Sequence, residues 1–447
     1  MSETLLIKGA RLIDPVAGTD AVGDLLVLDG KIAKASAAPS DARVIDGTGL
    51  VLTPGFIDLH THLREPGQED KESIKSGTAA GARGGFTTLC CMPNTVPAID
   101  NSTVVDFIKQ QASEAGAIRV LAFGAVSRGR LGKELTDMEE LARAGVVGFT
   151  DDGAPVATGH LMQSALLYAS QLGLPVMDHC EDYSIVKGLG INEGWVSSRL
   201  GLAGYPSAAE ESIVARDIAL SDLTGGHFHV AHLSTAGSTD MVRQAKAKGL
   251  RVTAEVTPHH LTLSEEWVLG THGHVETDAA VTLVAYETRA KVSPPLRSLG
   301  DQAALIEALR DGTIDAIATD HAPHTYGDKA TPFDEAPNGI SVLDTAFGML
   351  MGLVHAGEID LPTLVHRLTA GPVSVLGQRF AELATLAEGT PADLVLLAPE
   401  EEWQVDASTF ASKGQNTPLD GDTLRGRVKL TIAGGDIAYD GLNGLSG

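Results

Sequence analysis

The chain has 447 residues and a formal net charge of −25 at pH 7. This length suits one large α/β barrel with an accessory domain. The acidic balance argues against nucleic acid as a partner, because phosphate binding needs a clustered basic surface, but a small anionic substrate needs only a few arginines. We expect neither a signal peptide nor a membrane span, since no apolar run is long enough to cross a bilayer.

Both ends of the chain are rich in short predicted strands. Residues 4–53 contain apolar runs separated by turn signals such as Asp29-Gly30 and Asp46-Gly47. The C-terminal stretches "ADLVLLAP" and "GRVKLTIAGGDIAYDG" show the same pattern of short apolar runs and turn signals. We therefore predict a small β-sandwich domain built from residues 1–53 and 376–447.

Residues 54–375 alternate short apolar runs with helical segments. The runs are "GFIDLHTH", "FTTLCCMPN", "IRVLAFGAV", "VVGFTDDG", "LPVMDHCED", "HFHVAHLS", "RVTAEVTPHH" and "IDAIATDHAPH". Eight such runs separated by helices predict an α/β fold of the (β/α)8 barrel type. In the helical segment 207–226, Ser207 and Glu210 have capping-box spacing. Residues 264–291 are harder to assign and are expected to form a long loop with a short element.

Polar side chains follow the predicted barrel strands. His60 and His62 share one face at the end of the first run, with Asp58 one step deeper. The fourth run ends in Asp151 and Asp152, the fifth in His179, the sixth in His232 and the eighth in Asp320. Because the carboxyl ends of barrel strands meet at one face, we predict a metal site there.

Four histidines and two carboxylates exceed one tetrahedral shell and suit two ions bridged by a carboxylate. These ligands favour Zn²⁺, as one ion or, better suited to six ligands, as two. The fourth run contains no lysine that could be carbamylated, so an aspartate must bridge. Spacing alone does not choose between Asp151 and Asp152.

Other polar residues crowd the same strand ends. Arg64, Asn94 and His324 could together hold an anionic, amide-bearing ligand. Four further histidines are expected to be structural or to support the site: His227, His229, His259 and His260. His272 and His274 are expected to be exposed to solvent. The three cysteines, Cys90, Cys91 and Cys180, are expected to be buried thiols in a reducing cytoplasm.

These residues resemble a known family. The stretches "DLHTHLREPG", "CMPNT", "FTDDG", "VAHLSTAGS", "KVSPPLR" and "ATDHAPH" are similar to those of class I bacterial dihydroorotases of the amidohydrolase superfamily. The resemblance extends over nearly the whole chain. It implies the reversible cyclisation of N-carbamoyl-L-aspartate to L-dihydroorotate, with loss of water, in pyrimidine biosynthesis.

The resemblance also implies residue roles. The implied metal ligands are His60, His62, Asp152, His179, His232 and Asp320. Asp152 would bridge the ions, and Asp320 would also be the catalytic acid and base. Arg64, Asn94 and His324 would bind the substrate carboxylate, and the backbone around Asn338 and Gly339 would contact the pyrimidine ring.

The chain departs from the family pattern at two cavity positions. Ser293 stands where the family usually has a substrate-binding asparagine, and Asn338 stands where it usually has an aromatic residue. Residues 265–290 also look longer than usual. We expect these changes to affect substrate affinity more than metal binding.

Chemically, metal ions would turn a bridging water into hydroxide near neutral pH. That hydroxide would attack the ring amide, while Asp320 carries the proton to the leaving nitrogen.

One alternative is a hydantoinase or allantoinase, which usually carries a bridging lysine. Another is a non-catalytic scaffold for aspartate transcarbamoylase. The family implies a cytoplasmic homodimer acting on a small molecule, with a transcarbamoylase as a possible partner.

Overall fold

The computed structural model describes residues 3–186, 190–270 and 285–442. Parallel strands run through the middle of the chain: β6 (Phe56–Thr61), β7 (Phe86–Cys91), β8 (Arg119–Ala122), β9 (Val176–Asp178), β10 (Phe228–Val230), β11 (Val252–Val256) and β12 (Ala316–Ile317). Hydrogen bonds join β6, β7 and β8 in one parallel sheet and β9 to β12 in another.

Single bridges close these two sheets into a ring. Phe149, in the predicted fourth strand, pairs with Gly124 on one side and with Val176 on the other. Thr61 pairs with His321, and the His62 N–H donates to the His321 carbonyl at 2.9 Å. The predicted (β/α)8 barrel is therefore confirmed, although its fourth strand is only a short extended stretch.

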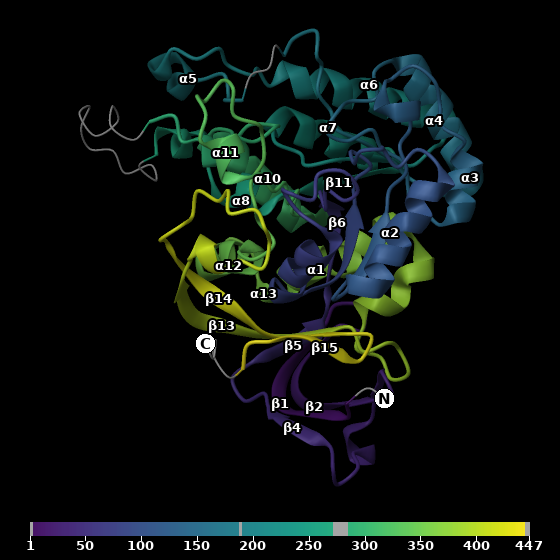
Figure 1. Cartoon of the computed structure of the whole chain (residues 1–447), viewed down its shortest axis with the longest axis vertical. Helices are drawn as coiled ribbons and strands as arrows, with labels where there is room; N and C mark the ends of the chain where they lie inside the picture. The colour runs from purple at the N-terminus through teal and green to yellow at the C-terminus, as the bar shows by residue number, and fades with distance from the viewer. Residues whose placement is uncertain (1–2, 187–189, 271–284, 443–447) are drawn as a thin grey trace.

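Helices surround the barrel (Figure 1). The longer ones are α1 (Ile74–Arg83), α2 (Ser102–Ala115), α3 (Met138–Ala144), α4 (Gly159–Leu172), α6 (Ala208–Thr224), α7 (Ala236–Ala247), α10 (Leu299–Asp311), α12 (Ala346–His355), α13 (Leu361–Leu368) and α14 (Ala370–Leu376). Three are short: α5 (Trp195–Leu200), α8 (Pro258–Thr262) and α11 (Tyr326–Lys329). Six 3-10 turns complete the described helices: η1 (Ala35–Ala37), η2 (Arg128–Arg130), η3 (Glu265–Leu269), η4 (Thr288–Ala290), η5 (Gln378–Ala384) and η6 (Ala407–Thr409).

Local sequence signals explain several helix ends. Ser73 and Asn101 accept hydrogen bonds from the first turns of α1 and α2. At the other end, α4 stops at Gly173 and α10 at Gly312, both with positive φ. Such short, well-defined ends let the chain return from each helix to the next strand.

The predicted capping box of α6 is wrong. Ser207 precedes the helix, but its side chain makes no capping hydrogen bond. The Glu210 carboxylate instead accepts hydrogen bonds from the backbone N–H groups of Ser234 and Thr235, each at 3.2 Å, and from the Ser234 hydroxyl. Glu210 therefore supports the loop after β10 rather than its own helix.

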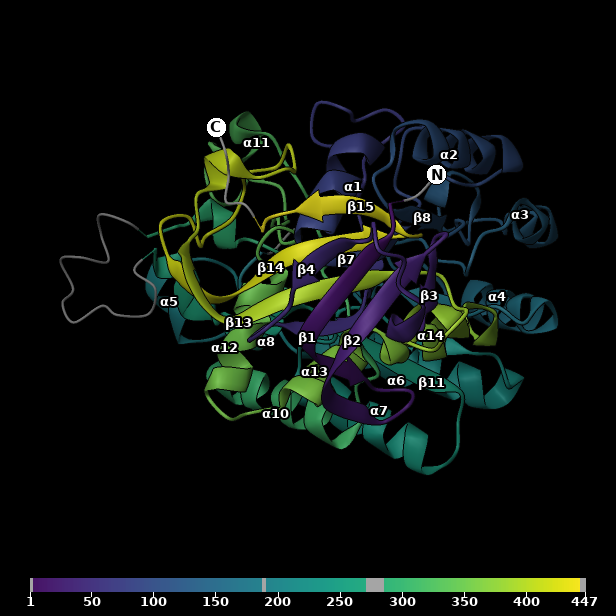
Figure 2. The same ribbon diagram turned by 90° about the horizontal axis from the view of Figure 1, so that it is seen from below.

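The two ends of the chain form a separate sheet outside the barrel. Its strands are β1 (Leu5–Asp14), β2 (Thr19–Leu28), β3 (Lys31–Ala33), β4 (Arg43–Asp46), β5 (Val51–Pro54), β13 (Leu394–Gln404), β14 (Thr423–Ala433) and β15 (Asp436–Asp440). They hydrogen-bond in the order β15-β14-β13-β5-β1-β2-β3, with β4 beside β1. Strands from both ends thus lie side by side (Figure 2).

This terminal sheet has its own apolar core, as a β-sandwich requires. The core includes Leu5, Ile7, Leu25, Val27, Leu52, Leu394, Leu396 and Leu430. Leu52 of β5 pairs with Leu396 of β13, so the N- and C-terminal parts share one ladder. The predicted β-sandwich built from both termini is confirmed, while the limits at residues 53 and 375 stay a prediction.

Three smaller expectations can be compared with the structure. Cys90, Cys91 and Cys180 are free and buried, as predicted. Among the described residues, no helix is long and apolar enough to cross a membrane. Residues 264–291 include η3 and η4, whereas His272 and His274 lie outside the described residues.

Candidate active site

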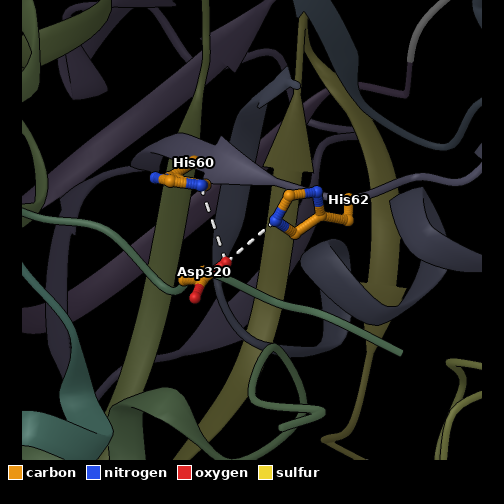
Figure 3. A group of neighbouring side chains, drawn as sticks. All are labelled: His60, His62 and Asp320. Carbon is orange, nitrogen blue, oxygen red and sulfur yellow. Dashed lines mark hydrogen bonds and ion pairs between the residues drawn. The ribbon is translucent and has the colours of Figure 1, made fainter. Parts of the chain in front are cut away.

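Two histidines of the first barrel strand meet an aspartate that follows the last. The Nε2 atom of His62 lies 2.9 Å from Oδ1 of Asp320, and Nε2 of His60 lies 3.5 Å from the same oxygen (Figure 3). All three side chains are buried. Below them, Asp58 accepts hydrogen bonds from the backbone and hydroxyl of Thr319, which ties the first strand to the eighth beneath the site.

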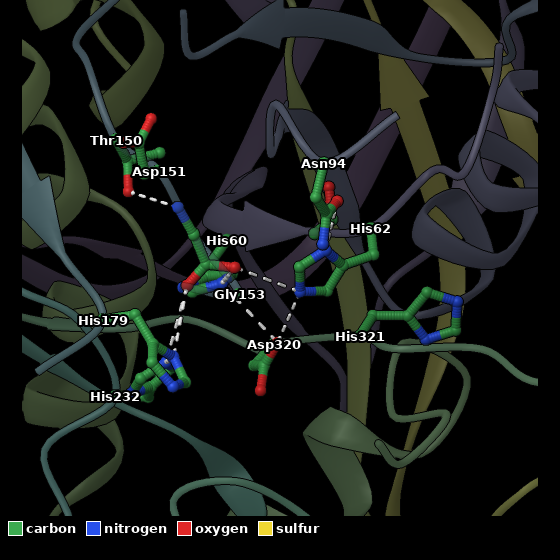
Figure 4. A network of polar contacts seen from close by, with 12 residues as sticks. His60, His62, Asn94, Thr150, Asp151, Gly153, His179, His232, Asp320 and His321 are labelled. Atoms are coloured by element: carbon green, nitrogen blue, oxygen red, sulfur yellow. Dashed lines mark hydrogen bonds and ion pairs between the residues drawn. The ribbon is translucent and has the colours of Figure 1, made fainter. Parts of the chain in front are cut away.

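The Asp152 carboxylate lies between two pairs of imidazoles. Its Oδ2 atom is 3.2 Å from Nε2 of His60 and 3.5 Å from Nε2 of His62. Its Oδ1 atom is 3.6 Å from both Nδ1 of His179 and Nε2 of His232. The four histidines converge from three strand ends, His60 and His62 from β6, His179 from β9 and His232 from β10 (Figure 4). One carboxylate oxygen therefore faces each pair.

Asp151 points elsewhere. Its carboxylate accepts hydrogen bonds from the Ser127 N–H at 3.0 Å and from the Ser127 hydroxyl at 2.5 Å. Spacing could not separate these two neighbours, but in the structure Asp152 faces the imidazoles and Asp151 supports an adjacent loop.

The histidine and aspartate groups are able to bind metal ions. Ligand atoms of His60, His62 and Asp320 lie within 4.8 Å of one another, as do those of His60, Asp152 and His232. His60 Nε2 and Asp152 Oδ1 are buried and have no hydrogen-bond partner among the described residues. Buried polar atoms normally have a partner, so these two are suited to an ion.

The imidazoles stabilise the ionised forms of the two aspartates. Burial alone would raise the pKa of Asp152, but the charge of His60 and the nearby imidazoles of His179 and His232 hold it well below its usual value. Burial acts in the same way on Asp320, and the charge of His60 and contacts with His62 outweigh it and lower the pKa. Both carboxylates are therefore ionised at neutral pH.

Two glutamates that the sequence analysis missed hydrogen-bond to the histidines. Glu255 Oε1 is 2.8 Å from Nδ1 of His60, and its Oε2 is 3.1 Å from Nε2 of His229. Glu181 Oε2 is 2.7 Å from Nε2 of His179. A carboxylate on the far nitrogen fixes the tautomer and orientation of a ligating imidazole.

A signal for Glu255 was present in the sequence, since it is an acid inside the otherwise apolar run "RVTAEV". It is fully buried. Burial would raise its pKa, but hydrogen bonds to His229 and His60 lower it to about 2. Glu255 is therefore a fixed negative charge beneath His60.

A cavity of about 540 Å³ opens beside the histidine and aspartate groups. All six residues predicted to bind substrate line it: Arg64, Asn94, Ser293, His324, Asn338 and Gly339. His62, Asp152, His179, His232 and Asp320 also line it, together with Gly153, Glu181, Tyr183 and Val186, which were not predicted. The structure thus brings the two predicted sets to one cavity.

Arg64 is the one arginine or lysine among the described residues that line this cavity. It is 8% exposed, and its Nε atom has no hydrogen-bond partner in the described part of the chain. Burial lowers the pKa of Arg64 to about 10, so the guanidinium stays charged at neutral pH. An anionic group of a ligand would satisfy both its charge and its free donor.

The remaining predicted contacts are held by neighbours. Asn94 Oδ1 lies 3.0 Å from Nδ1 of His62. His324 Nε2 donates to the Asn338 carbonyl at 2.9 Å, and burial lowers the pKa of His324 to about 3, so it is neutral here. Ser293 Oγ lies 3.4 Å from Glu181 Oε2, a long contact.

Backbone strain is concentrated at this site. Of the six non-glycine residues with positive φ in the described ranges, three line the cavity: Arg64 (61°), His232 (31°) and Asp320 (45°). Such conformations cost energy and persist where the surroundings enforce them, commonly at functional sites. Gly339 has φ of 143°, and a Cβ there would come within 2.6 Å of the Ala322 carbonyl.

Of the four further histidines expected to be structural or to support the site, three have hydrogen-bond partners. His227 Nε2 and His229 Nδ1 each lie 2.8 Å from the Thr253 hydroxyl. His260 Nε2 donates to the Pro294 carbonyl at 3.0 Å. His259 is buried, and neither of its nitrogens has a hydrogen-bond partner among the described residues.

The chain is similar in sequence to known proteins. Residues 49–238 match the family model described as Dihydro-orotase-like. The chain is 48% identical over 436 residues to the dihydroorotase of Pelotomaculum thermopropionicum, covering 97% of this chain and 98% of that protein. It is also 48% identical to the dihydroorotase of Anaeromyxobacter dehalogenans, covering 98% and 99% of the two chains.

Among solved structures, the fold is similar to that of an L-hydantoinase (dihydropyrimidinase) from Arthrobacter aurescens. The TM-score is 0.84 at 24% identity, covering 98% of this chain and 96% of the hydantoinase. That likeness concerns the fold. The near-complete coverage of the dihydroorotases at almost half identity identifies the chain as a member of the dihydroorotase family.

Proposed function

We propose that this protein catalyses the reversible cyclisation of N-carbamoyl-L-aspartate to L-dihydroorotate. The observation that carries the proposal is one cavity in which the histidine and aspartate groups share the space with a single buried arginine. A cyclic amide with a carboxylate substituent needs both features. The full-length similarity to dihydroorotases supports the same assignment.

The proposed ligands are His60, His62, Asp152, His179, His232 and Asp320. Imidazole nitrogens and carboxylate oxygens suit Zn²⁺, and we propose two ions with Asp152 between them. Bound zinc would activate a water and polarise the amide carbonyl. The opposed oxygens of Asp152, one toward each pair of imidazoles, support two ions over one.

Asp320 is the proposed proton carrier. Its carboxylate is ionised, lies beside His62 and His60, and lines the cavity. An ionised carboxylate in this place can accept a proton from the attacking water and deliver it to the leaving ring nitrogen. In the direction of cyclisation the same group would accept the proton of the carbamoyl nitrogen.

The proposed carboxylate site consists of Arg64, Asn94 and His324. Arg64 supplies the charge, and Asn94 is oriented by His62. His324 is neutral, so a bound carboxylate would raise its pKa and gain a second cation. Ser293, Asn338 and Gly339 would contact the rest of the ligand from the opposite wall.

We also propose a cytoplasmic homodimer, with a transcarbamoylase as a possible partner. Three buried free thiols are compatible with a reducing compartment, and the family resemblance supports the dimer.

The proposal is tested by following the ultraviolet loss of L-dihydroorotate with purified protein. We expect turnover that a chelator removes and added zinc restores. Hydrolysis of hydantoin or allantoin in its place would assign the cavity to another cyclic amide. Metal binding without turnover of any of these compounds would favour a scaffold role.

A further inference from the structure

Lys329 ends the short helix α11 and is 5% exposed. Its Nζ donates three hydrogen bonds, all to backbone carbonyls: Pro337 at 2.7 Å, Thr288 at 3.0 Å and Lys291 at 3.2 Å. An ammonium has three donors, so these contacts use its full capacity.

The three carbonyls belong to two segments that carry cavity residues. Lys291 is two positions before Ser293, and Pro337 directly precedes Asn338. The segments also touch each other, since the Gly339 N–H donates to the Lys291 carbonyl at 2.9 Å. Lys329 therefore joins both segments at the point where they meet.

Further hydrogen bonds fix Lys329 itself. The Thr288 hydroxyl donates back to the Lys329 carbonyl at 2.6 Å. His324, five positions earlier, donates to the Asn338 carbonyl. The cavity wall, the helix α11 and the His324 segment are thus one hydrogen-bonded unit.

Burying an ammonium group contributes little net stability by itself. Removing a charge from water costs free energy that neutral carbonyls only partly restore. Burial and the nearby Lys291 lower the pKa of Lys329 to about 7. The nearby acids have other partners: Glu287 pairs with Arg289 at 2.8 Å, and Asp328 lies 3.4 Å from Lys71.

We propose that Lys329 is a positioning residue for substrate binding, which holds the Ser293 segment and the Asn338–Gly339 segment at a fixed separation beside the cavity that Arg64 also lines. This inference rests on the proposed function, because it concerns the substrate bound between those walls. Lys329 acts through the two segments and does not line the main cavity itself.

The first test compares Lys329→Met with wild-type protein in the dihydroorotate assay. We expect KM to rise about tenfold while kcat changes by less than about threefold, as for a loss of binding rather than of chemistry. Lys329→Gln keeps donors at this position, so its KM should lie between those of wild type and Lys329→Met. This milder variant covers the case in which Lys329→Met fails to fold.

Lys246→Met is the matched control. Lys246 Nζ also joins two segments, donating to the Gly312 carbonyl at 3.2 Å and pairing with Asp315 at 2.6 Å, but away from the cavity. This control should leave KM unchanged. Unchanged KM in folded Lys329→Met, or the same rise in Lys246→Met, would overturn the proposal.

Amide hydrogen exchange gives a second readout that needs no activity. In Lys329→Met, exchange at Gly339 should become faster than in wild type, while the peptides around β6 stay protected. Unchanged exchange at Gly339 would overturn the positioning role. Failure of wild-type protein to turn over dihydroorotate would instead count against the proposed function and leave this exchange measurement decisive for Lys329.

Discussion

The two walls of the cavity are built differently. The proposed metal-binding wall consists of side chains at strand ends, and carboxylates hydrogen-bond to two of its histidines: Glu255 to His60 and Glu181 to His179. The loop wall consists of residues such as Ser293 and Gly339, held by hydrogen bonds between backbone groups and by Lys329. Changes in the first wall should alter metal content and turnover, whereas changes in the second should alter substrate affinity.

The largest expected effect comes from Asp320, the proposed proton carrier. Asp320→Asn keeps the shape of the side chain but removes its capacity to accept a proton, so kcat should fall by about 10²–10⁴-fold. The assay should be run at saturating zinc, with circular dichroism to verify the fold. Activity close to wild type would exclude Asp320 from proton transfer.

A neighbouring pair of aspartates tests the metal-binding wall directly. Asp152→Asn should weaken zinc binding by about 100-fold, because it removes charge from the centre of the four imidazoles. Asp151→Asn is the control, since Asp151 bonds Ser127 instead. Zinc content is measured by elemental analysis after dialysis against a weak chelator. Equal zinc loss in both variants would contradict the assignment of Asp152, rather than Asp151, as the zinc ligand.

Among the residues proposed to bind substrate, Arg64 should matter most for affinity. Arg64→Gln removes the charge that faces the substrate carboxylate, so KM should rise by about 10–100-fold, the usual range for a charge-assisted hydrogen bond. Zinc content should match that of wild type. If zinc is lost along with affinity, the two walls are not separable in this way.

The smallest effect is expected at Ser293. Its hydroxyl makes only a 3.4 Å contact with Glu181. Ser293→Asn would extend an amide further into the cavity and should lower KM by about two- to fivefold, the scale of one added neutral hydrogen bond. A higher KM would show that the loop binds substrate in another way.

The same difference between the walls decides what the sequence could predict. His60 and His62 alternate along a strand, so their common direction follows from strand geometry. Asp320 and His232 end other apolar runs, and barrel topology brings such ends together. Arg64 follows the first strand so closely that it too could be named from the sequence. Ser293 and Asn338 lie on loops, whose course has no such period, and only the family resemblance indicated them.

Two features could not be predicted from local spacing. Only the family resemblance indicated Asp152 over Asp151, because the choice depends on the path of a short extended stretch that carries only one bridge on each side. Glu210 had the spacing of a capping residue but bonds Ser234 and Thr235 on another strand's loop. Spacing along the sequence shows which local hydrogen bonds a side chain could make. In the folded chain, a partner from a distant segment can take the place of the local one.

The closure of the barrel also has a consequence for synthesis. His62 and Asp320 are 258 positions apart and meet at 2.9 Å, and β13 must reach β5 to complete the terminal ladder. A chain growing on the ribosome therefore carries its first histidines long before their partner exists. The proposed ligand group is therefore incomplete until the last barrel strand has emerged, and the terminal ladder is incomplete until β13 has followed it.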